Sequence, residues 1–287
     1  MPDLAAMQIS AVIPSFNRAY SLERAVTSVL DQKSSVEEII LVDDGSTDRS
    51  CDDLVAKYPQ LKLIKQSNQG VSAARNTGIA AAAYAWIALL DSDDSWLPNK
   101  IESIRRAQHQ HPGYVLYHSD EIWVRNGKRV NQMNKHQKAG GWIFNQCLSL
   151  CAISPSAAVM QKSTIEDLGM FDPDLPACED YDLWLRLCHR FPVYYIEQAL
   201  ITKFGGHADQ LSQKYWGMDR FRIRSLNRLL EQESLTAENF APAVATIVAK
   251  LGILLAGARK RENQQVLDEF KPLLQKWERQ ISEAMPC

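Results

Sequence analysis

The fold of this chain is decided by the stretch Trp86-Ile87-Ala88-Leu89-Leu90-Asp91-Ser92-Asp93-Asp94. An apolar run of this length that ends in a polar cluster predicts a buried strand of a parallel sheet. Three carboxylates crowd the point where the strand ends, and like charges this close repel unless a cation joins them. Mg²⁺ and Mn²⁺ prefer carboxylate oxygen and often bridge to phosphates. The stretch therefore indicates a metal and diphosphate site, with a solvated acidic turn that caps the next helix as the alternative.

The residues before this stretch alternate between the periods of strands and helices. Apolar runs predict strands at 8–14, 38–42 and 61–65, and helical spacing predicts helices from Ser21, around 52–58 and over 70–83. Strands that alternate with helices are typical of an α/β fold with a parallel sheet covered on both faces. A further strand or strand pair is predicted at 114–124, and another strand at 155–160.

Charge and cysteine content exclude several classes of protein. The net charge of −2 gives no electrostatic case for binding nucleic acid or an anionic membrane. The six cysteines show neither a Cys-x-x-Cys framework nor a histidine at zinc-ligand spacing, so we expect reduced, structural thiols and a cytoplasmic location. The first residues lack the pattern of a signal peptide, and no stretch reaches the ~18 uncharged apolar residues of a spanning helix.

Polar side chains follow three of the predicted strands at the point where each strand ends. They are Ser15, Asn17 and Arg18 after the first strand, Asp43 and Asp44 after the second, and 91–94 after the fourth. Each group could be ordinary turn chemistry, but repetition at one edge favours the ligand crevice that open α/β sheets form there. The chain has no glycine-rich phosphate loop after the first strand. Metal and side chains would therefore have to hold the phosphates of a nucleotide.

Four segments resemble those of the family 2 glycosyltransferases with the GT-A fold, in the family's order and spacing over roughly residues 8–95. They are Val12-Ile13-Pro14-Ser15-Phe16-Asn17-Arg18, Leu41-Val42-Asp43-Asp44-Gly45-Ser46-Thr47-Asp48, Gly70-Val71-Ser72-Ala73-Ala74-Arg75-Asn76-Thr77-Gly78 and Leu90-Asp91-Ser92-Asp93-Asp94. The resemblance implies a Rossmann-like mixed, mostly parallel sheet flanked by helices. It also implies an inverting transferase that uses a nucleotide-sugar donor, expected to be UDP-linked, and a divalent metal, Mn²⁺ or Mg²⁺. One departure is Tyr84-Ala85, where we expect a change of packing only.

The resemblance also assigns roles to residues. Those assigned to the donor are Pro14, Ser15, Asn17 and Asp44 along the base and ribose, Arg75 at the diphosphate, and Asp91, Ser92 and Asp93 at the D-x-D motif. Asp91 is expected toward the ribose and Asp93 on the metal. The double acid leaves the division of metal binding among Asp91, Asp93 and Asp94 open.

A second acidic pair, Glu179 and Asp180, stands in the first turn of a predicted helix whose apolar face includes Leu183 and Trp184. The helix dipole favours acids there, which is a purely structural explanation. The segment also resembles the family's acceptor-side motif. That resemblance implies that Asp180 removes the acceptor's proton and that Glu179 supports it or contacts the acceptor, because a carboxylate at the right distance suffices for this task.

Two loops carry further candidates. The segment 202–212 follows a predicted strand and is similar to one found past the catalytic core in many relatives, which implies a role for His207 at the diphosphate or metal; polar surface is the alternative. The basic loop 125–141 is interpreted as solvated surface, with a lid or part of an acceptor groove for an anionic substrate as the alternatives.

The chain from about 215 onward is predicted to be helical, with an apolar run at 241–258 that Lys250 interrupts. We expect this run to pack under the catalytic domain. A homodimer seam and a peripheral contact at the inner membrane face are the alternatives. The expected organisation is thus a catalytic domain at 1–210 and a helical C-terminal extension at 211–287.

These patterns predict a metal-dependent inverting glycosyltransferase that moves a sugar to a hydroxyl of a saccharide or lipid-linked saccharide in cell-surface polysaccharide or glycolipid synthesis. Two alternatives are a nucleotide-sugar-binding module without transferase activity and a nucleotidyltransferase. The latter would carry a glycine-rich basic loop after its first strand, where this chain has Pro14-Ser15-Phe16-Asn17.

Overall fold

The computed structural model describes residues 7–207 and 214–284. Within these residues, nine strands form one sheet in the order β3-β2-β1-β4-β8-β6-β9-β5, and β7 pairs with β6. The strands are β1 (Ile9–Ser15), β2 (Glu38–Asp43), β3 (Lys62–Lys65), β4 (Trp86–Leu89), β5 (Ser95–Trp96), β6 (Leu116–Arg125), β7 (Lys128–Val130), β8 (Val159–Gln161) and β9 (Tyr194–Gly205).

The direction of the strands reverses at β8. The four strands of the first half, β3, β2, β1 and β4, are parallel to one another. β8 runs antiparallel to both β4 and β6, and β6 runs parallel to β9. The predicted mixed sheet flanked by helices is confirmed, with its parallel pairings mainly in the first half. The carboxyl ends of β1, β2 and β4 lie at one edge of it.

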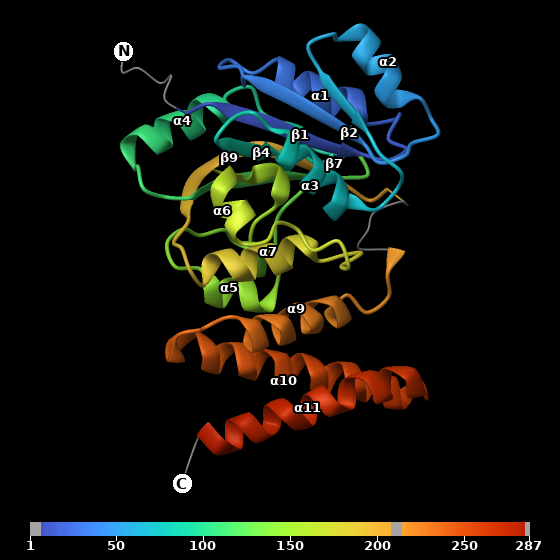
Figure 1. The fold of residues 1–287 in the computed structure, drawn as a ribbon, viewed down its shortest axis with the longest axis vertical. Coiled ribbons are helices and arrows are strands. Elements are labelled where there is room, and N and C mark those ends of the chain that lie inside the picture. Colours follow the sequence, from blue (N-terminus) through green and yellow to red (C-terminus); the bar gives the residue numbers. More distant parts are fainter. Residues whose placement is uncertain (1–6, 208–213, 285–287) are drawn as a thin grey trace.

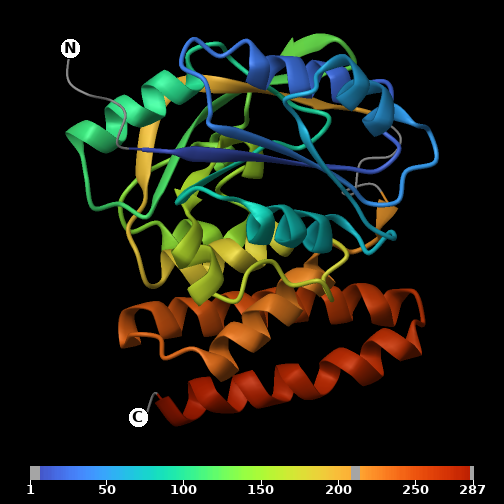
Figure 2. The same ribbon diagram turned by 45° about the horizontal axis from the view of Figure 1, so that its top comes forward.

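Helices cover both faces of the sheet, and a further helical layer lies beneath one face (Figures 1 and 2). On one face lie α1 (Leu22–Leu30), α2 (Ser50–Lys57) and α4 (Lys100–Gln110); on the other lie α3 (Val71–Ala81), α5 (Phe144–Ser149), α6 (Lys162–Asp167) and α7 (Glu179–Cys188). The outer layer consists of α9 (Asp219–Gln232), α10 (Ala237–Lys260) and α11 (Gln264–Ala284).

Gly78 allows α3 to lie unusually close to the sheet. A Cβ atom at this position would stand 2.4 Å from a Val12 methyl group and 3.1 Å from one of Val42. Both valines are fully buried in β1 and β2, so neither can move aside cheaply. The glycine thus fixes the height of α3 over the sheet, and with it the position of Arg75 one turn earlier.

Two of the strand predictions are refined by the structure. The 114–124 stretch forms the single strand β6, which continues through a tight turn at Asn126-Gly127 into β7; both turn residues have positive φ (49° and 74°), as a two-residue hairpin requires. The predicted strand at 155–160 is wrong in its first half. Pro155 begins the 3₁₀ helix η3 (Pro155–Ala157), and only Val159–Gln161 forms a strand.

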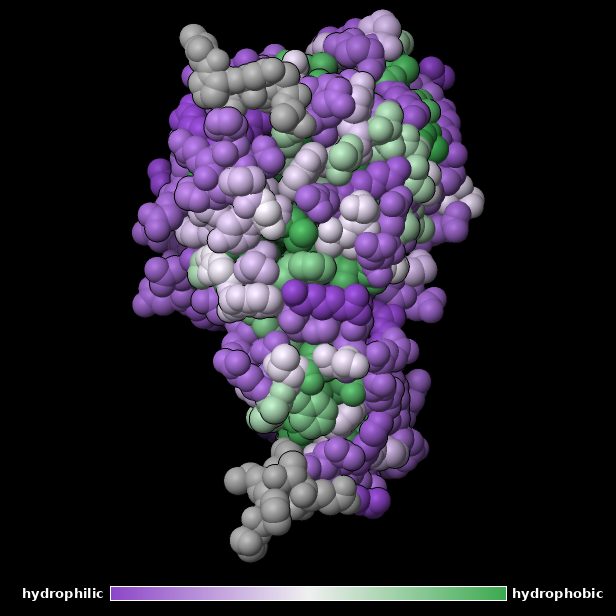
Figure 3. Space-filling view, turned by 60° about the vertical axis from the view of Figure 1, so that its left-hand side comes forward, coloured by the Kyte–Doolittle hydropathy of each residue, from purple (hydrophilic) through white to green (hydrophobic). Residues whose placement is uncertain are grey.

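The C-terminal helices pack under the catalytic body, as expected from their apolar faces. α9 contacts α7, and α10 contacts α5, α9 and α11. One apolar cluster runs without a break from β1 through α7 to Leu226, Ile247 and Phe270 of the three helices. α10 is long and apolar enough to cross a membrane, with a mean hydropathy of 1.9, but it carries mainly small residues on its exposed face. On the face shown in Figure 3, hydrophilic residues dominate and apolar ones form small patches.

We propose that the catalytic domain ends near residue 210 and depends on the helical extension beyond it for its stability, and truncation tests this dependence. A chain that ends at Gly206 should be insoluble or should melt well below the full chain, because the apolar faces of α5 and α7 lose the layer that covers them. Each kcal/mol lost lowers the melting temperature of a chain of this size by ~2–4 °C. A chain that lacks only residues 285–287 is the control. A soluble 1–206 chain with an unchanged melting temperature would show that the helices are a separate module.

Candidate active site

Arg75 joins the acids of the sheet edge to the acids of α7. One guanidinium nitrogen lies 2.6 Å from Asp91 Oδ1, just past β4, and another lies 2.6 Å from Glu179 Oε1 in the first turn of α7. The side chains of Arg75 and Glu179 are only 4% and 7% exposed, so this pair is shielded from water, whereas Asp91 is 26% exposed. Burial and the charge of Asp180 raise the pKa of Glu179, which the positive charge of Arg75 opposes. The two acidic motifs therefore form one charged cluster.

Asp93 faces His207 across the crevice. Its Oδ2 lies 2.9 Å from His207 Nε2, and Tyr20 lies on the other side of the imidazole, with its hydroxyl 3.5 Å from Nδ1. Arg24 of α1 donates a 2.6 Å hydrogen bond to the backbone carbonyl of Asp93 and so fixes the turn. Burial and the negative charge of Asp91 raise the pKa of Asp93, against the effects of Arg18 and His207.

Asp94 points into the protein instead. Its Oδ2 accepts a 2.6 Å hydrogen bond from the Ser156 hydroxyl and its Oδ1 accepts one of 3.1 Å from the backbone N–H of Phe204. The residue is 2% exposed, and burial together with Asp93 raises its pKa well above the ordinary value while Lys203 lowers it. Both carboxylate oxygens are thus committed to holding the turn against η3 and β9, which favours Asp93 over Asp94 as a metal ligand.

The fit of this turn to a divalent ion can be judged from its donor atoms. In the part of the chain that the structure describes, no three His, Cys, Asp or Glu side chains are grouped as a metal site. Asp91 is paired with Arg75, which leaves the Asp93 carboxylate and the His207 imidazole as the donors at the crevice. One or two protein ligands plus substrate phosphates and water is the usual arrangement for Mg²⁺ at nucleotide sites. The residues therefore fit an ion that arrives with a diphosphate.

Asp180 is held differently from Glu179. Its Oδ1 accepts a 2.7 Å hydrogen bond from the backbone N–H of Tyr181, and its Oδ2 accepts one of 3.0 Å from the Cys151 thiol. Burial and the charge of Asp180 raise the pKa of Cys151 well above its ordinary value, so the thiol keeps the proton that it donates. Asp180 is partly exposed and has no arginine partner among residues 7–207 and 214–284. It is the acid of this pair that can reach a ligand.

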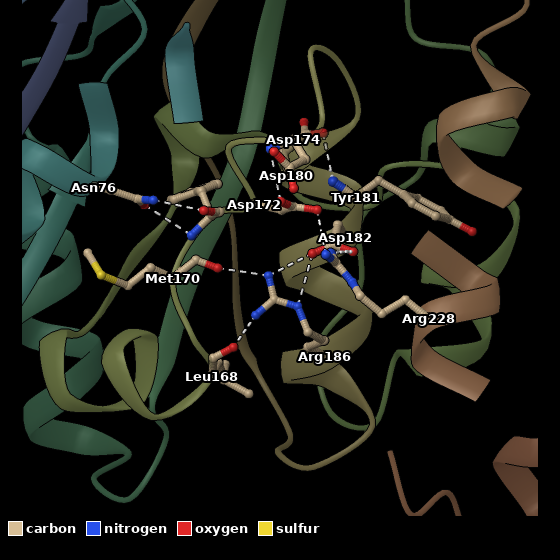
Figure 4. A network of polar contacts seen from close by, with 11 residues as sticks. Asn76, Leu168, Met170, Asp172, Asp174, Asp180, Tyr181, Asp182, Arg186 and Arg228 are labelled. Carbon is tan, nitrogen blue, oxygen red and sulfur yellow. Dashed lines mark hydrogen bonds and ion pairs between the residues drawn. The ribbon is translucent and has the colours of Figure 1, made fainter. Parts of the chain in front are cut away.

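A network of arginines and acids fixes α7 (Figure 4). Arg186 donates hydrogen bonds to Asp182 and to the backbone carbonyls of Leu168 and Met170. Arg228 of α9 lies between Asp182 and Asp172, and so ties the C-terminal layer to the helix that carries Asp180. The position of Asp180 thus depends on residues from three separate parts of the chain.

The residues predicted to line the base and ribose do meet at the same edge. Asn17 has a positive φ of 53° and its side chain accepts a hydrogen bond from the N–H of Thr47, which joins the ends of β1 and β2. Ser15 and Pro14 are buried in β1, and Ser92 is buried after β4. Asp44 turns toward the loop before α3, where it accepts hydrogen bonds from Gln66, Gln69 and Gly70. Its structural role is to shape that loop.

Sequence reasoning missed three residues of the site. Cys151 was grouped with the structural cysteines, and only its contact with Asp180 distinguishes it. Lys203 is buried beside Asp94 and donates a 3.0 Å hydrogen bond to Ser154; nothing in the β9 pattern signals this. Tyr20 lies two residues past the first motif, and the only signal in the sequence is an aromatic residue beside a polar turn. The segment 208–212 lies outside the described residues.

Comparisons with known proteins show the family of this chain. The model of the family described as glycosyl transferase family 2 matches residues 10–168, more than half of the chain. An uncharacterized glycosyltransferase of Nostoc sp. is 30% identical over 250 residues, which cover 84% of this chain and 72% of that protein. The UDP-Glc:alpha-D-GlcNAc-diphosphoundecaprenol beta-1,3-glucosyltransferase WfgD of Escherichia coli is 29% identical over 62% of this chain and 69% of its own length. By contrast, the chain spans 32% of a similar glycosyltransferase of Rickettsia conorii.

The fold also has a solved counterpart. The structure of S. aureus TarS 1-349 in complex with UDP-GlcNAc superposes with a TM-score of 0.64 over 95% of this chain and 92% of that one. At 15% sequence identity this likeness concerns the fold, including the C-terminal part of the chain.

Proposed function

Because this chain belongs to glycosyl transferase family 2, we propose that it transfers a sugar from a UDP-linked donor to a hydroxyl group of a saccharide acceptor, with inversion at the anomeric carbon. The observation that carries the proposal is the pair of 2.6 Å contacts from Arg75 to Asp91 and Glu179. They join the first turn of α7, which carries Asp180, to the sheet edge where the donor is expected, and so support Asp180 as the acceptor-side acid. WfgD acts on a sugar linked to diphosphoundecaprenol, which supports a lipid-linked saccharide as the acceptor and cell-surface polysaccharide as the product.

In this proposal Asp180 accepts the proton of the attacking hydroxyl as the new bond forms on the opposite face of the sugar from the diphosphate. The hydrogen bonds from Tyr181 and Cys151 orient its carboxylate for this step. Glu179 is buried and ion-paired, so its part is to hold Arg75 and the first turn of α7 in place. Arg75 is expected to act on the donor through Asp91, with which it is paired, rather than as a free cation.

Asp93 and His207 are the residues that would hold Mn²⁺ or Mg²⁺. A bound divalent ion withdraws negative charge from a departing diphosphate. The Asp93 carboxylate already feels the repulsion of Asp91, so a cation at this turn would relieve an existing strain of like charges.

Both alternatives considered from the sequence are less well supported. A nucleotidyltransferase does not agree with the family, and a silent binding module would have no need for an orientated carboxylate such as Asp180. We further propose that the enzyme works at the cytoplasmic face of the inner membrane, where a lipid-linked acceptor would be found. A peripheral membrane contact and a homodimer seam on α10 stay predictions that no contact of the structure tests.

The metal is tested by calorimetry. UDP is expected to bind about tenfold or more weakly in the presence of a chelator than with Mn²⁺, a difference of at least ~1.4 kcal/mol in binding free energy. Asp93→Ala should remove this difference, because the ion loses its carboxylate ligand. Asp53→Ala, on the exposed surface of α2, is the matched control. Equal affinity of the wild-type protein with chelator and with Mn²⁺ would contradict the proposed metal.

A further inference from the structure

A hollow lies beside the β6–β7 hairpin, outside the charged cluster. It has a volume of about 640 Å³ and is formed by β6, β7, the first part of β9 and the segment 131–138. We call it the hairpin pocket. The basic loop noted in the sequence forms its outer wall, so this loop contributes to a concave surface of a size that fits one or two sugar rings.

The side chains of the hairpin pocket have the chemistry that a sugar requires. Carboxylates of Asp120 and Glu197 can accept hydrogen bonds from hydroxyls. The Gln132 amide nitrogen donates to Asp120 Oδ1 and to the Glu121 backbone carbonyl, which leaves the amide oxygen to accept a hydrogen bond. Two aromatic residues, Trp123 and Tyr195, also line it. An aromatic ring offers a flat apolar surface to the C–H face of a pyranose. The indole N–H of Trp123 is already bonded to Glu121 Oε1, so this residue offers its ring face only.

The charge of the hairpin pocket selects among sugars. Three acids line it, Asp120, Glu121 and Glu197, against two bases, Arg129 and Lys138. Lys138 is already paired with Glu121 at 3.3 Å, and both side chains are buried. The remaining balance is acidic, which disfavours a phosphate or a uronate. The anionic acceptor considered for this loop from the sequence is therefore not what the pocket favours; a neutral sugar fits better.

The carboxylate of Glu121 is enclosed behind the pocket wall, with its side chain 0% exposed. The residue is 4% exposed; its Oε1 accepts a 2.7 Å hydrogen bond from the Trp123 indole, while its Oε2 has no hydrogen-bond partner in residues 7–207 and 214–284. Burial raises the pKa of Glu121, but the charges of Lys138 and Lys203 oppose this and lower the pKa to about 2, so the group is a carboxylate at neutral pH. Lys138 and Trp123 hold this carboxylate in place, and it is not open to a ligand.

The hairpin pocket is linked to Asp180 by a short series of contacts. Lys138 lines the pocket and donates a 3.0 Å hydrogen bond to the backbone carbonyl of Ala152. The preceding residue, Cys151, donates its thiol hydrogen bond to Asp180. The pocket therefore lies beside the proposed acceptor site, on the other side of Lys138 and the 151–152 backbone.

We propose that the hairpin pocket binds a neutral sugar unit of an extended saccharide acceptor whose reacting unit lies at Asp180. This inference rests on the proposed transferase function and adds a subsite to it. It makes the acceptor an oligosaccharide of at least two units, recognised through hydroxyl groups rather than through charge.

The test uses the full-length protein labelled with 5-fluorotryptophan, and ¹⁹F NMR during titration with glucose, N-acetylglucosamine, cellobiose, lactose, chitobiose and glucuronic acid. The chain has seven tryptophans, and Trp123→Phe identifies the resonance of the pocket. At least one neutral sugar is expected to shift the Trp123 resonance saturably, and glucuronic acid should bind more weakly. A Trp123 resonance that no sugar shifts, or tighter binding of glucuronic acid, would overturn the inference.

Substitutions in the pocket wall test whether the neutral sugar binds there. Asp120→Ala/Glu197→Ala should weaken binding of the neutral sugar by about tenfold or more, because hydrogen bonds to charged groups are lost. Glu102→Ala, an exposed acid on α4 outside the pocket, is the matched control. Melting temperatures show whether each variant is folded. Wild-type affinity in the double variant would reject the pocket.

The proposed sugar-binding role of the pocket and the proposed transferase function can be tested separately. Asp180→Asn should bind the neutral sugar as the wild-type protein does, since Asp180 is not part of the pocket wall. If the wild-type protein transfers sugar and the pocket variants bind the neutral sugar as tightly as the wild type, the pocket is rejected and the proposed function is supported. Sugar binding at Trp123 without transfer from any UDP-sugar would support the pocket and reject the transferase.

Discussion

Asp180→Asn is expected to lower sugar transfer by about 10²–10⁴-fold, the usual effect of removing a general base. Asparagine keeps the shape of the side chain and can still accept the hydrogen bond from the Tyr181 N–H, but it cannot take a proton. The folded state should change little, because Asp180 is partly exposed and has no buried ion pair. Donor affinity should also persist, since the donor is expected at the ends of β1, β2 and β4.

The measurement is the rate of transfer from UDP-sugars to saccharide acceptors, with UDP affinity and melting temperature determined on the same samples. Asp174→Asn is the matched control, because Asp174 lies in the same loop region and is exposed (Figure 4). A variant that loses UDP binding or unfolds would make Asp180 a donor ligand or a helix cap. Transfer at the wild-type rate would assign the proton to another acid, with Glu179 as the next candidate.

The alternation of strands and helices in the first half of the chain could be predicted because each element there is set by its own residues. The apolar run of β4 and the helical spacing of α1 are local properties, and the structure has both where the sequence indicated. The strand predicted at 155–160 failed because Pro155 starts a turn whose backbone is fixed by contacts with Asp94 and Trp96, 60 or so residues away. Such contacts leave no trace in local periodicity.

The candidate site shows the same division. The positions of Asp91, Asp93, Glu179 and Asp180 at the ends of their elements followed from sequence, but their partners did not. Arg75 and Glu179 are 104 residues apart, and Cys151 and Asp180 are 29 apart, so both contacts depend on how α3, α5 and α7 pack. For the same reason the sequence could not show that Asp94 and Asp44 turn inward.

The buried ion pairs of Arg75 lead to the second large expected effect. Arg75→Met should lower the free energy of unfolding by about 3–5 kcal/mol, because it leaves Glu179 buried without its partner. The exposed pair of Arg106 and Glu102 provides the matched control: its side chains are 57% and 38% exposed, so Arg106→Met should change stability little. Denaturant unfolding of both variants at pH 7 gives the comparison, and transfer activity should fall with Arg75→Met because α7 is no longer tied to Asp91.

The pH dependence of this loss distinguishes an unpaired charge from lost packing. Burial already raises the pKa of Glu179 from its ordinary value of 4.5, and removal of Arg75 takes away the effect that opposed this rise. A carboxyl group whose pKa is raised in the folded state favours folding only when it is protonated. Its contribution to stability is therefore fully present when the pH is below the pKa of the unfolded chain, and it is lost as the pH rises through the pKa of the folded state. The instability of Arg75→Met should therefore be greatest at neutral pH and shrink as the pH falls toward 4.5.

Arg75→Met/Glu179→Met, which removes both members of the pair, should recover much of the stability at pH 7. A loss that is the same at every pH and persists in the double variant would mean that Arg75 acts by packing against Phe171 rather than by its charge.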